Sequence, residues 1–445
     1  MAGKFPHTLL IIVSFILMAG VATYVLPKGE YDRIVDPATN REIVVPGSYH
    51  AVDAKPLSPF AILLGIPRGI AAGVEVIITI FIAGACFYVV EKTGALKEGI
   101  LFITNRLKGR EQVTLVLTGI FFLTGGTLEG MEEEIIPLIP VLLMLTRRLG
   151  YNAFVTISIS YGSAVIGASF SPFNPFGAIT GQRIAGVPLL TAAPFQLVVL
   201  VVAFILWMTM ILWYGNRNRL PKDEEAFIAP TTISWRNAVI LGIVVFAFVL
   251  LIYGMMTMGW GFNELSAEFF VVGVLAGLIG RLGINGTCTA YVEGLREMTF
   301  AALIVGFAHG ISLVLMDGKI LDTIIHGLFI PMAGLPPALS AVGMMFSQSI
   351  LHVVVPAYTG QAALTIPILA PLSDLIGLSR QVCVLAFQYG AILMNMISPT
   401  NGAIMAIIAL SGITYDKWFV FVGKRLLVIW GVGALALLIG WVLRI

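Results

Sequence analysis

Long apolar runs separated by short polar segments dominate this chain. The first run, residues 8–26, is close to the ~20 residues that a helix needs to cross a ~30 Å hydrocarbon layer. Comparable runs follow along the whole length, so the pattern predicts an all-α polytopic membrane protein. The other predicted spanning runs are residues 73–90, 153–170 with a continuation to about 184, 195–213, 238–256, 269–279, 300–316, 381–397 and 418–443.

The composition agrees with this pattern. Hydrophobic residues make up 58% of the 445 residues and charged residues 11%, whereas a soluble domain carries roughly 25% charged residues. Such an excess of apolar surface excludes a soluble enzyme, and a net charge of +2 offers no basic surface for nucleic acid. The three cysteines form no metal or disulfide motif, and no nucleophile, zinc or phosphate-loop signature occurs, so we expect neither enzymatic activity nor a cofactor.

Two pairs of runs are too short to cross the membrane one run at a time. In the first half, residues 112–124 and 135–145 flank a polar, glycine-rich and glutamate-rich stretch. We interpret residues 112–146 as a re-entrant hairpin, whose polar tip is tolerated only inside protein or beside a watery cavity. A surface loop between two short helices is the alternative. Residues 338–374 form the corresponding pair in the second half, around a tip at residues 352–361.

Matches at a nearly constant spacing indicate an internal duplication. Pro140 precedes Pro367 by 227 positions, and Ser171-Pro172 precedes Ser398-Pro399 by the same interval. The duplication divides the chain into residues 1–216, a cytoplasmic linker at 217–235, and residues 236–445.

The extra crossing near residues 269–279 inverts the second copy relative to the first. Inverted repeats with broken helices are typical of secondary transporters. Lysine and arginine residues concentrate in alternate loops, which favours a cytoplasmic N-terminus because positively charged loops stay inside.

Each copy contains a helix that its own sequence interrupts, within residues 152–185 and 380–410. Proline removes a backbone donor and blocks the preceding turn, while asparagine, serine and glycine supply polar groups and unusual dihedrals. A simple kink is the alternative, but the recurrence favours a break whose freed amides bind a carboxylate and whose oxygens bind a sodium ion. The predicted break residues are Pro172, Pro175, Gly177, Pro399 and Gly402. The predicted binding residues there are Ser171, Asn174, Asn395, Ser398, Thr400 and Asn401; no metal is assigned, and a sodium ion near Ser171, Asn174, Ser398 and Asn401 is one alternative.

Four glutamates gather at the tip of the first hairpin: Glu129, Glu132, Glu133 and Glu134. Intramembrane carboxylates are costly, so we interpret the cluster as a site for a coupling ion, a proton or a substrate amine; a solvated charge cluster is the alternative. Like charges disfavour joint ionisation, and Glu132 and Glu133 are favoured over Glu134. Thr127, Tyr358, Thr359 and Gln361 complete the predicted site, whereas His309 is expected to be a hydrogen-bonded core residue.

The segments Lys4-Phe5-Pro6-His7-Thr8 and Pro27-Lys28-Gly29-Glu30-Tyr31 resemble the YfcC-like family of bacterial inner-membrane carriers. This family is grouped with the C4-dicarboxylate uptake C carriers and the basic amino-acid (arginine/ornithine) antiporters of the ion transporter superfamily. The resemblance covers essentially the whole chain. It implies two inverted repeats, each with a re-entrant hairpin and a broken helix, that move as an elevator against a dimerising scaffold.

In the sodium–carboxylate members of the superfamily, Ser-Asn-Thr motifs at the hairpin tips hold carboxylate and sodium. The tips of this chain read Gly-Thr-Leu-Glu-Gly and Pro-Ala-Tyr-Thr-Gly, so these sites do not carry over. Only the broken helices match in kind, at Ser171, Asn174, Ser398, Thr400 and Asn401.

The sequence thus predicts a secondary active transporter of a small charged organic solute in the bacterial cytoplasmic membrane. A basic amino acid such as arginine or ornithine is favoured because of the glutamate-rich tip. A sodium- or proton-coupled carrier of C4-dicarboxylates is the alternative, with the glutamates serving the coupling ion. An ion channel fits less well, because broken helices and hairpins suit alternating access. The expected partners are the substrate, the lipid bilayer and a second copy of the chain in a homodimer.

Overall fold

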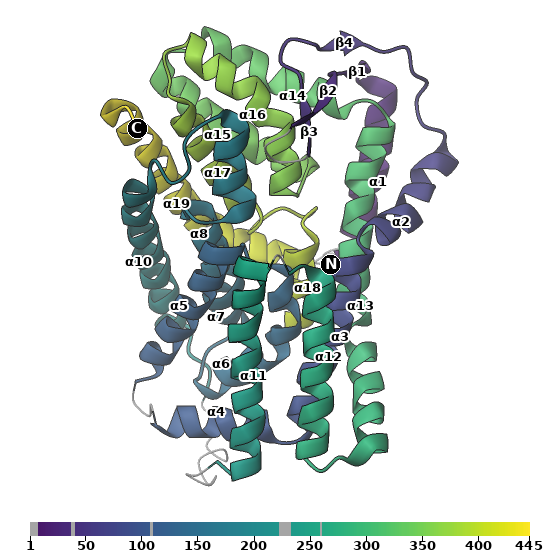
Figure 1. Cartoon of the computed structure of the whole chain (residues 1–445), viewed down its shortest axis with the longest axis vertical. Coiled ribbons are helices and arrows are strands. Elements are labelled where there is room, and N and C mark those ends of the chain that lie inside the picture. Colours follow the sequence, from purple (N-terminus) through teal and green to yellow (C-terminus); the bar gives the residue numbers. More distant parts are fainter. Residues whose placement is uncertain (1–7, 37–40, 107–109, 222–232, 259) are drawn as a thin grey trace, which may run out of the picture.

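The computed structural model describes residues 8–36, 41–106, 110–221, 233–258 and 260–445, and almost all of them are helical (Figure 1). The first half contains α1 (Thr8–Val25), α2 (Pro59–Ala72), α3 (Val74–Lys92), α4 (Ala95–Arg106), α5 (Glu111–Glu129), η1 (Glu133–Leu138), α6 (Ile139–Arg148), α7 (Ala153–Ile157), η2 (Ser158–Gly162), α8 (Ser163–Phe170), η3 (Pro175–Ile179), α9 (Thr180–Ala185) and α10 (Ala193–Arg217). The second half contains α11 (Trp235–Tyr253), η5 (Gly254–Met258), α12 (Phe262–Ile279), α13 (Gly283–Asp317), α14 (Leu321–Phe329), η6 (Ile330–Gly334), α15 (Pro337–Val354), α16 (Tyr358–Leu375), α17 (Arg380–Met394), α18 (Gly402–Ser411) and α19 (Tyr415–Leu443).

Eight helices of the described residues are long and apolar enough to cross a membrane. Each predicted run is helical over most of its length, but the run at 300–316 is only the second half of α13, a helix of 35 residues that begins at Gly283. The apolar pattern did not predict α2, because this helix has only 14 residues and an internal proline, which is too short for a spanning run. The Lys4–His7 part of the opening motif and most of the predicted linker lie outside the described residues.

The non-helical tips of both hairpins are shorter in the structure than the sequence predicts. α5 continues through Gly125–Glu129 and is 19 residues long, so its polar end is helical and not a loop. The close approach of α8 explains the glycines, since a Cβ at Gly126 would lie 2.0 Å from the Ala164 carbonyl oxygen. At the second tip, α16 already begins at Tyr358, and only residues 355–357 connect it to α15.

The element bounds repeat at the spacing seen in the sequence. α7 begins at Ala153 and α17 at Arg380, and the helical structure after each interruption resumes at Pro175 and Gly402. Both pairs are 227 positions apart. In Figure 1 the pair α15–α16 lies in the upper part of the molecule, whereas α5 and α6 lie in the lower part.

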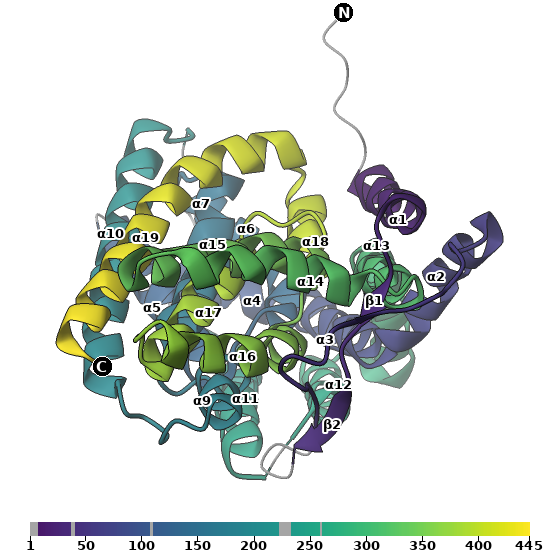
Figure 2. The same ribbon diagram turned by 90° about the horizontal axis from the view of Figure 1, so that it is seen from above.

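The helices pack in two groups that meet around the site described below. In one group α13 packs against α1, α2 and α3, and α12 packs against α3 and α11. In the other, α5 packs against α8, α15 against α17, and α10 against α19 (Figure 2). The groups touch where α13 meets α18 and where α3 meets η1, so the tip of the first hairpin lies at the junction.

A short non-helical segment after α1 is held against α14. It forms two antiparallel ladders, β1 (Gly29–Glu30) with β4 (His50–Ala51) and β2 (Arg33–Asp36) with β3 (Arg41–Val44). Asp322 of α14 accepts bonds from the Arg33 guanidinium at 2.8 Å and from the Tyr31 amide at 2.9 Å. Burial, with Asp322 and Tyr49 nearby, raises the pKa of Tyr31 to about 12. Its hydroxyl lies 2.9 Å from His326 Nδ1.

The glycine contact between α5 and α8 generates a first prediction. We expect Gly126→Ala to lower the unfolding stability by about 1–3 kcal/mol, because its Cβ meets backbone that cannot move aside. Thermal unfolding of the purified protein in detergent measures this. The control is Gly242→Ala in α11, where a Cβ meets nothing within 4 Å; helix propensity should make it neutral or up to about 1 kcal/mol stabilising. Equal melting temperatures for the two variants would show that the contact does not matter.

Candidate functional site

Two helices are interrupted near the middle of the molecule, and the chain at each interruption is not helical. α8 ends at Phe170 and helical structure resumes at Pro175, while α17 ends at Met394 and α18 begins at Gly402. A proline near each interruption cannot donate to the preceding turn, and an asparagine caps each new helix. The predicted break residues therefore all lie in or directly beside the two interruptions.

The first interruption satisfies its own backbone. Ser171 Oγ accepts bonds from the amides of Phe173 and Asn174 at 2.8 and 2.9 Å. Asn174 Oδ1 accepts from the amides of Phe176 and Gly177, both at 2.9 Å. These amides are therefore engaged within the chain, and the bound carboxylate expected at Ser171–Asn174 has no free donors among them.

The same residues fasten the interruption to the end of α5. Ser171 Oγ donates to the Thr127 carbonyl at 2.6 Å, and Asn174 Nδ2 donates to the Gly126 carbonyl at 3.3 Å. The Thr127 hydroxyl turns away and donates to the Leu123 carbonyl of its own helix at 2.7 Å. Thr127, Ser171 and Asn174 thus hold the first hairpin in place.

The second interruption faces the glutamate cluster instead. Asn401 Oδ1 accepts from the Ile404 amide at 3.0 Å, while Asn401 Nδ2 donates to Asn395 Oδ1 at 2.8 Å and to Glu132 Oε2 at 3.4 Å. Ser398 and Thr400 are fully buried and bond each other at 2.6 Å. The hydroxyls of Ser398 and Thr400 thus bond each other, whereas Asn401 bonds the backbone of α18, Asn395 and Glu132.

Glu132 is the most completely bonded side chain of the site. It is 3% exposed, and its carboxylate accepts from Asn395 Nδ2 at 2.7 Å, from the Tyr161 hydroxyl at 3.2 Å, from Asn401 and from the Tyr358 hydroxyl. A buried carboxylate needs such donors, because desolvation would otherwise exclude the charge. The hydrogen bonds of Glu132 therefore join the tips of both hairpins.

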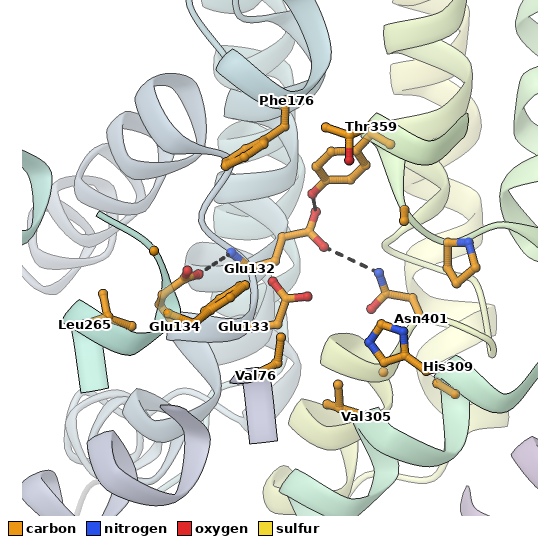
Figure 3. A pocket seen from close by; sticks show the side chains of 18 of the residues that line it. Val76, Glu132, Glu133, Glu134, Phe176, Leu265, Val305, His309, Thr359 and Asn401 are labelled. Atoms are coloured by element: carbon orange, nitrogen blue, oxygen red, sulfur yellow. Dashed lines mark hydrogen bonds between the residues drawn. The ribbon is translucent and has the colours of Figure 1, made fainter. Parts of the chain in front are cut away.

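Glu133 and Glu134 face a cavity of about 310 Å³ (Figure 3). Glu134 Oε2 accepts a bond from the Glu132 amide at 3.0 Å. No side chain of the described residues donates a hydrogen bond to Glu133, whose carboxylate points into the cavity between Val76 and Asn401. Glu133 is thus the carboxylate with the greatest freedom to bind a ligand. The Glu129 side chain lies outside the described part of the chain.

Both helix groups supply the walls of this cavity. The lining residues are Val76, Gly130, Glu132, Glu133, Glu134, Phe176, Trp260, Gly261, Phe262, Leu265, Val305, Ala308, His309, Pro356, Ala357, Tyr358, Thr359, Thr400, Asn401 and Gly402. None of these is lysine or arginine, so three glutamates dominate the electrostatics. No group of three or more His, Cys, Asp or Glu that could hold a metal ion occurs within the described residues.

The structure gathers some predicted site residues and separates others. Tyr358, Thr359, Thr400 and Asn401 line the cavity with the glutamates, and Asn395 stands behind Glu132. Gln361 points away and bonds His352 and Gln348.

The expectation for His309 was wrong, because its ring is exposed to the cavity and is not a hydrogen-bonded core group. The sequence reading also missed Trp260 and Phe262, since an aromatic residue that lines a cavity has the same sequence signature as one that faces lipid.

Two solved structures are similar to the whole chain at low scores. The YdaH transporter of Alcanivorax borkumensis has a TM-score of 0.45 and 12% identity over 98% of both chains. The Neisseria gonorrhoeae MtrF structure, titled as one of a class of antimetabolite efflux pumps, has a TM-score of 0.44 and 16% identity over 98% of this chain and 95% of its own.

The sequence matches are closer. The model of the family described as "DcuC: C4-dicarboxylate anaerobic carrier" matches residues 5–442. The Escherichia coli protein named "Putative basic amino acid antiporter YfcC" is 30% identical, with 93% of this chain and 92% of that protein covered. An uncharacterized Haemophilus influenzae protein is 26% identical over 94% of this chain and 93% of its own length. The chain therefore belongs to the DcuC family of membrane transporters, as the resemblance of its sequence to YfcC-like carriers predicted.

Proposed function

We propose that this chain is a secondary active transporter that exchanges a basic amino acid, of the arginine or ornithine type, across the cytoplasmic membrane. The observation that carries the proposal is the Glu133 carboxylate, which opens into a cavity that contains two further glutamates and no lysine or arginine. Such a cavity attracts a cationic solute and repels a dicarboxylate. The name of the Escherichia coli relative points to the same substrate class.

The two ends of an amino acid find different partners in this cavity. The side-chain cation lies between Glu133 and Glu134. The carboxylate lies at the N-terminus of α16, where Ala357 provides no side-chain cap and the Thr359 hydroxyl stands beside the first amides. The positive end of a helix dipole stabilises an anion there. This assignment replaces the amides at Ser171–Asn174, which bond within the chain.

The architecture proposed for transport is a pair of inverted repeats, residues 1–216 and 236–445, joined by the linker at 217–235. Support comes from the element bounds that recur 227 positions apart and from the opposite placement of the two hairpins in Figure 1. Both hairpins are re-entrant in this proposal. An N-terminus in the cytoplasm follows from the distribution of lysine and arginine.

The movement proposed is an elevator-like alternating access. α5–α10 and α15–α19 form the moving group, and α1–α4 with α11–α13 form the scaffold of a homodimer. The packing supports this division, because the helices contact each other extensively inside each group and mainly through α13–α18 and α3–η1 between the groups. The cavity lies at that boundary, where a relative shift exposes it first to one side and then to the other.

Replacement of Glu133 tests the substrate assignment. We expect Glu133→Gln to weaken arginine binding by about 10–100-fold, because a charge-assisted hydrogen bond contributes about 1.5–3 kcal/mol. The stability should not fall, since no side chain of the described residues donates to Glu133. Calorimetric titration of arginine into the purified protein and a thermal melt measure the two effects. The control is Asp374→Asn, an exposed carboxylate outside the cavity that pairs with Arg380 at 2.7 Å; it should bind arginine like the wild type.

Competition in proteoliposomes separates the two substrate classes. Unlabelled ornithine should abolish the uptake of labelled arginine, and succinate should not. Inhibition by succinate, together with unchanged arginine binding in Glu133→Gln, would refute the basic amino acid assignment and favour a dicarboxylate carrier.

Replacement of Glu132 should lower the unfolding stability, unlike replacement of Glu133. In Glu132→Gln an amide nitrogen replaces one of the two oxygens and faces the donor of either Asn395, which bonds Oε1, or Asn401, which bonds Oε2. The unfolding stability should therefore fall by about 1–3 kcal/mol, the cost of unmatched buried polar groups. The loss of transport should appear mainly in the maximal exchange rate, because Glu132 joins the two hairpins. Thermal melts and saturation curves for arginine exchange measure this. A variant that melts like the wild type would contradict the role of Glu132 as the internal tie.

A further inference from the structure

The imidazole of His352 lies behind the glutamate cluster and is fully buried. It belongs to the last turns of α15. Its Nδ1 lies 2.7 Å from Gln361 Oε1, and its Nε2 bonds Asn395 Oδ1. Both ring nitrogens therefore face the oxygen atom of a side-chain amide. A neutral imidazole has one donor and one acceptor nitrogen, so the orientation of these two amides decides how many protons the ring carries.

Further hydrogen bonds fix the Asn395 amide. Its Nδ2 donates to Glu132 Oε1 at 2.7 Å, and its Oδ1 accepts from Asn401 Nδ2 at 2.8 Å. If the Asn395 side-chain amide were rotated by 180°, its oxygen would face the Glu132 carboxylate and its nitrogen would face the amide nitrogen of Asn401. Two repulsive contacts would replace two good bonds, so Oδ1 faces His352.

Backbone groups fix the Gln361 amide in the same way. Its Nε2 donates to the Gln348 carbonyl at 2.8 Å and to Gln348 Oε1 at 2.6 Å. Gln348 in turn donates to the Thr365 hydroxyl at 2.8 Å, and that hydroxyl donates to the Gln361 carbonyl at 2.8 Å. The direction of every bond in this series follows from two backbone carbonyls, which can only accept. Gln361 Oε1 therefore faces His352 as an acceptor.

We propose that His352 is a proton-binding site that holds its imidazole as the doubly protonated cation, and that its proton exchanges for the cationic substrate. Burial alone disfavours a charged ring. Here two amide oxygens accept its protons, and the Glu132 carboxylate, one amide away through Asn395, balances the charge. Three other titratable groups lie around the ring. Tyr358 stacks on it with a distance of 6.2 Å between the ring centroids, and Tyr161 and Glu133 lie beyond Glu132.

This inference rests on the proposed function, since it supplies the ion that a cationic solute would exchange against. A substrate cation at Glu133 adds a second positive charge near the imidazolium, so binding favours release of one proton from His352 to water. The neutral ring then has one nitrogen without a proton, which repels an amide oxygen. If Asn395 turns to relieve this contact, its amide leaves Glu132, and the tie between the two hairpins weakens. The proton and the substrate thus bind in competition.

The protonation of His352 can be read without any substrate. The chain has five histidines, and nitrogen NMR of protein with labelled histidine, compared with the His352→Gln variant, identifies the signal of this ring. We expect both ring nitrogens to carry protons at pH 7.5 in the unliganded wild type. A signal from a neutral ring with one protonated nitrogen would overturn the proposal, whatever the substrate is.

The coupling is measured in proteoliposomes. His352→Gln should still exchange labelled arginine at equal pH on both sides, within about threefold of wild type, while accumulation driven by an acidic interior should fall by about tenfold or more. Retention of the pH-driven accumulation in this variant would refute the coupling role. A variant that fails to fold is recognised because it loses exchange as well. In that case we measure proton release on arginine binding to the wild-type protein, by calorimetry in two buffers. The absence of proton release would refute the coupling. Failure of arginine to bind the wild type would instead refute the proposed function and leave the NMR result standing.

Discussion

The buried carboxylate of Glu132 is the constraint on which the centre of this protein depends. A charge removed from water persists only where hydrogen-bond donors replace its solvation. Glu132 takes its donors from Tyr161 in η2, from Tyr358 at the start of α16 and from Asn395 and Asn401 beside the second interruption. One side chain of the first hairpin thus fixes the position of the second hairpin. The halves of the chain therefore meet at their centre through a polar contact, which can be exchanged for another arrangement more easily than a packed apolar one.

The two helix interruptions share their bounds but not their chemistry. At the first, Ser171 and Asn174 satisfy the loose amides and bond the carbonyls of α5, so this interruption is a structural joint. At the second, Asn401 caps its helix and also donates to Glu132 and Asn395. Of the two interruptions, only the second therefore supplies donors to the Glu132 carboxylate.

The helical architecture could be predicted from the sequence to a large extent. Apolar runs gave nearly all long helices, and the recurrence of Ser171-Pro172 at Ser398-Pro399 located both interruptions, because a proline acts on its own backbone wherever it stands. The extent of the tips was predicted wrongly. Gly126 looks like a loop residue, but it is helical because α8 packs directly against it, and no local pattern contains that contact.

The contacts of the individual site residues could not be predicted from the sequence. Glu132 and Glu133 are neighbours in a run of acidic residues, and their different surroundings arise from Tyr358, Asn395 and Asn401, which are more than two hundred positions away. His352 carried no signal either, because a histidine near a helix end is ordinary. Its significance follows from the orientation of two amides, which the sequence does not encode locally.

The charge of the cavity is an argument for the proposed exchange over a carrier that returns empty. Glu132, Glu133 and Glu134 lie in a cavity where no lysine or arginine lines the wall. In surroundings of low dielectric constant, uncompensated carboxylates repel each other strongly, and moving them across the membrane without a counter-charge is costly. In the proposed exchange, a bound cation near Glu133 lowers this cost, and so does a proton held at His352. The empty carrier is then the state that crosses least readily, which is the physical reason for proposing exchange.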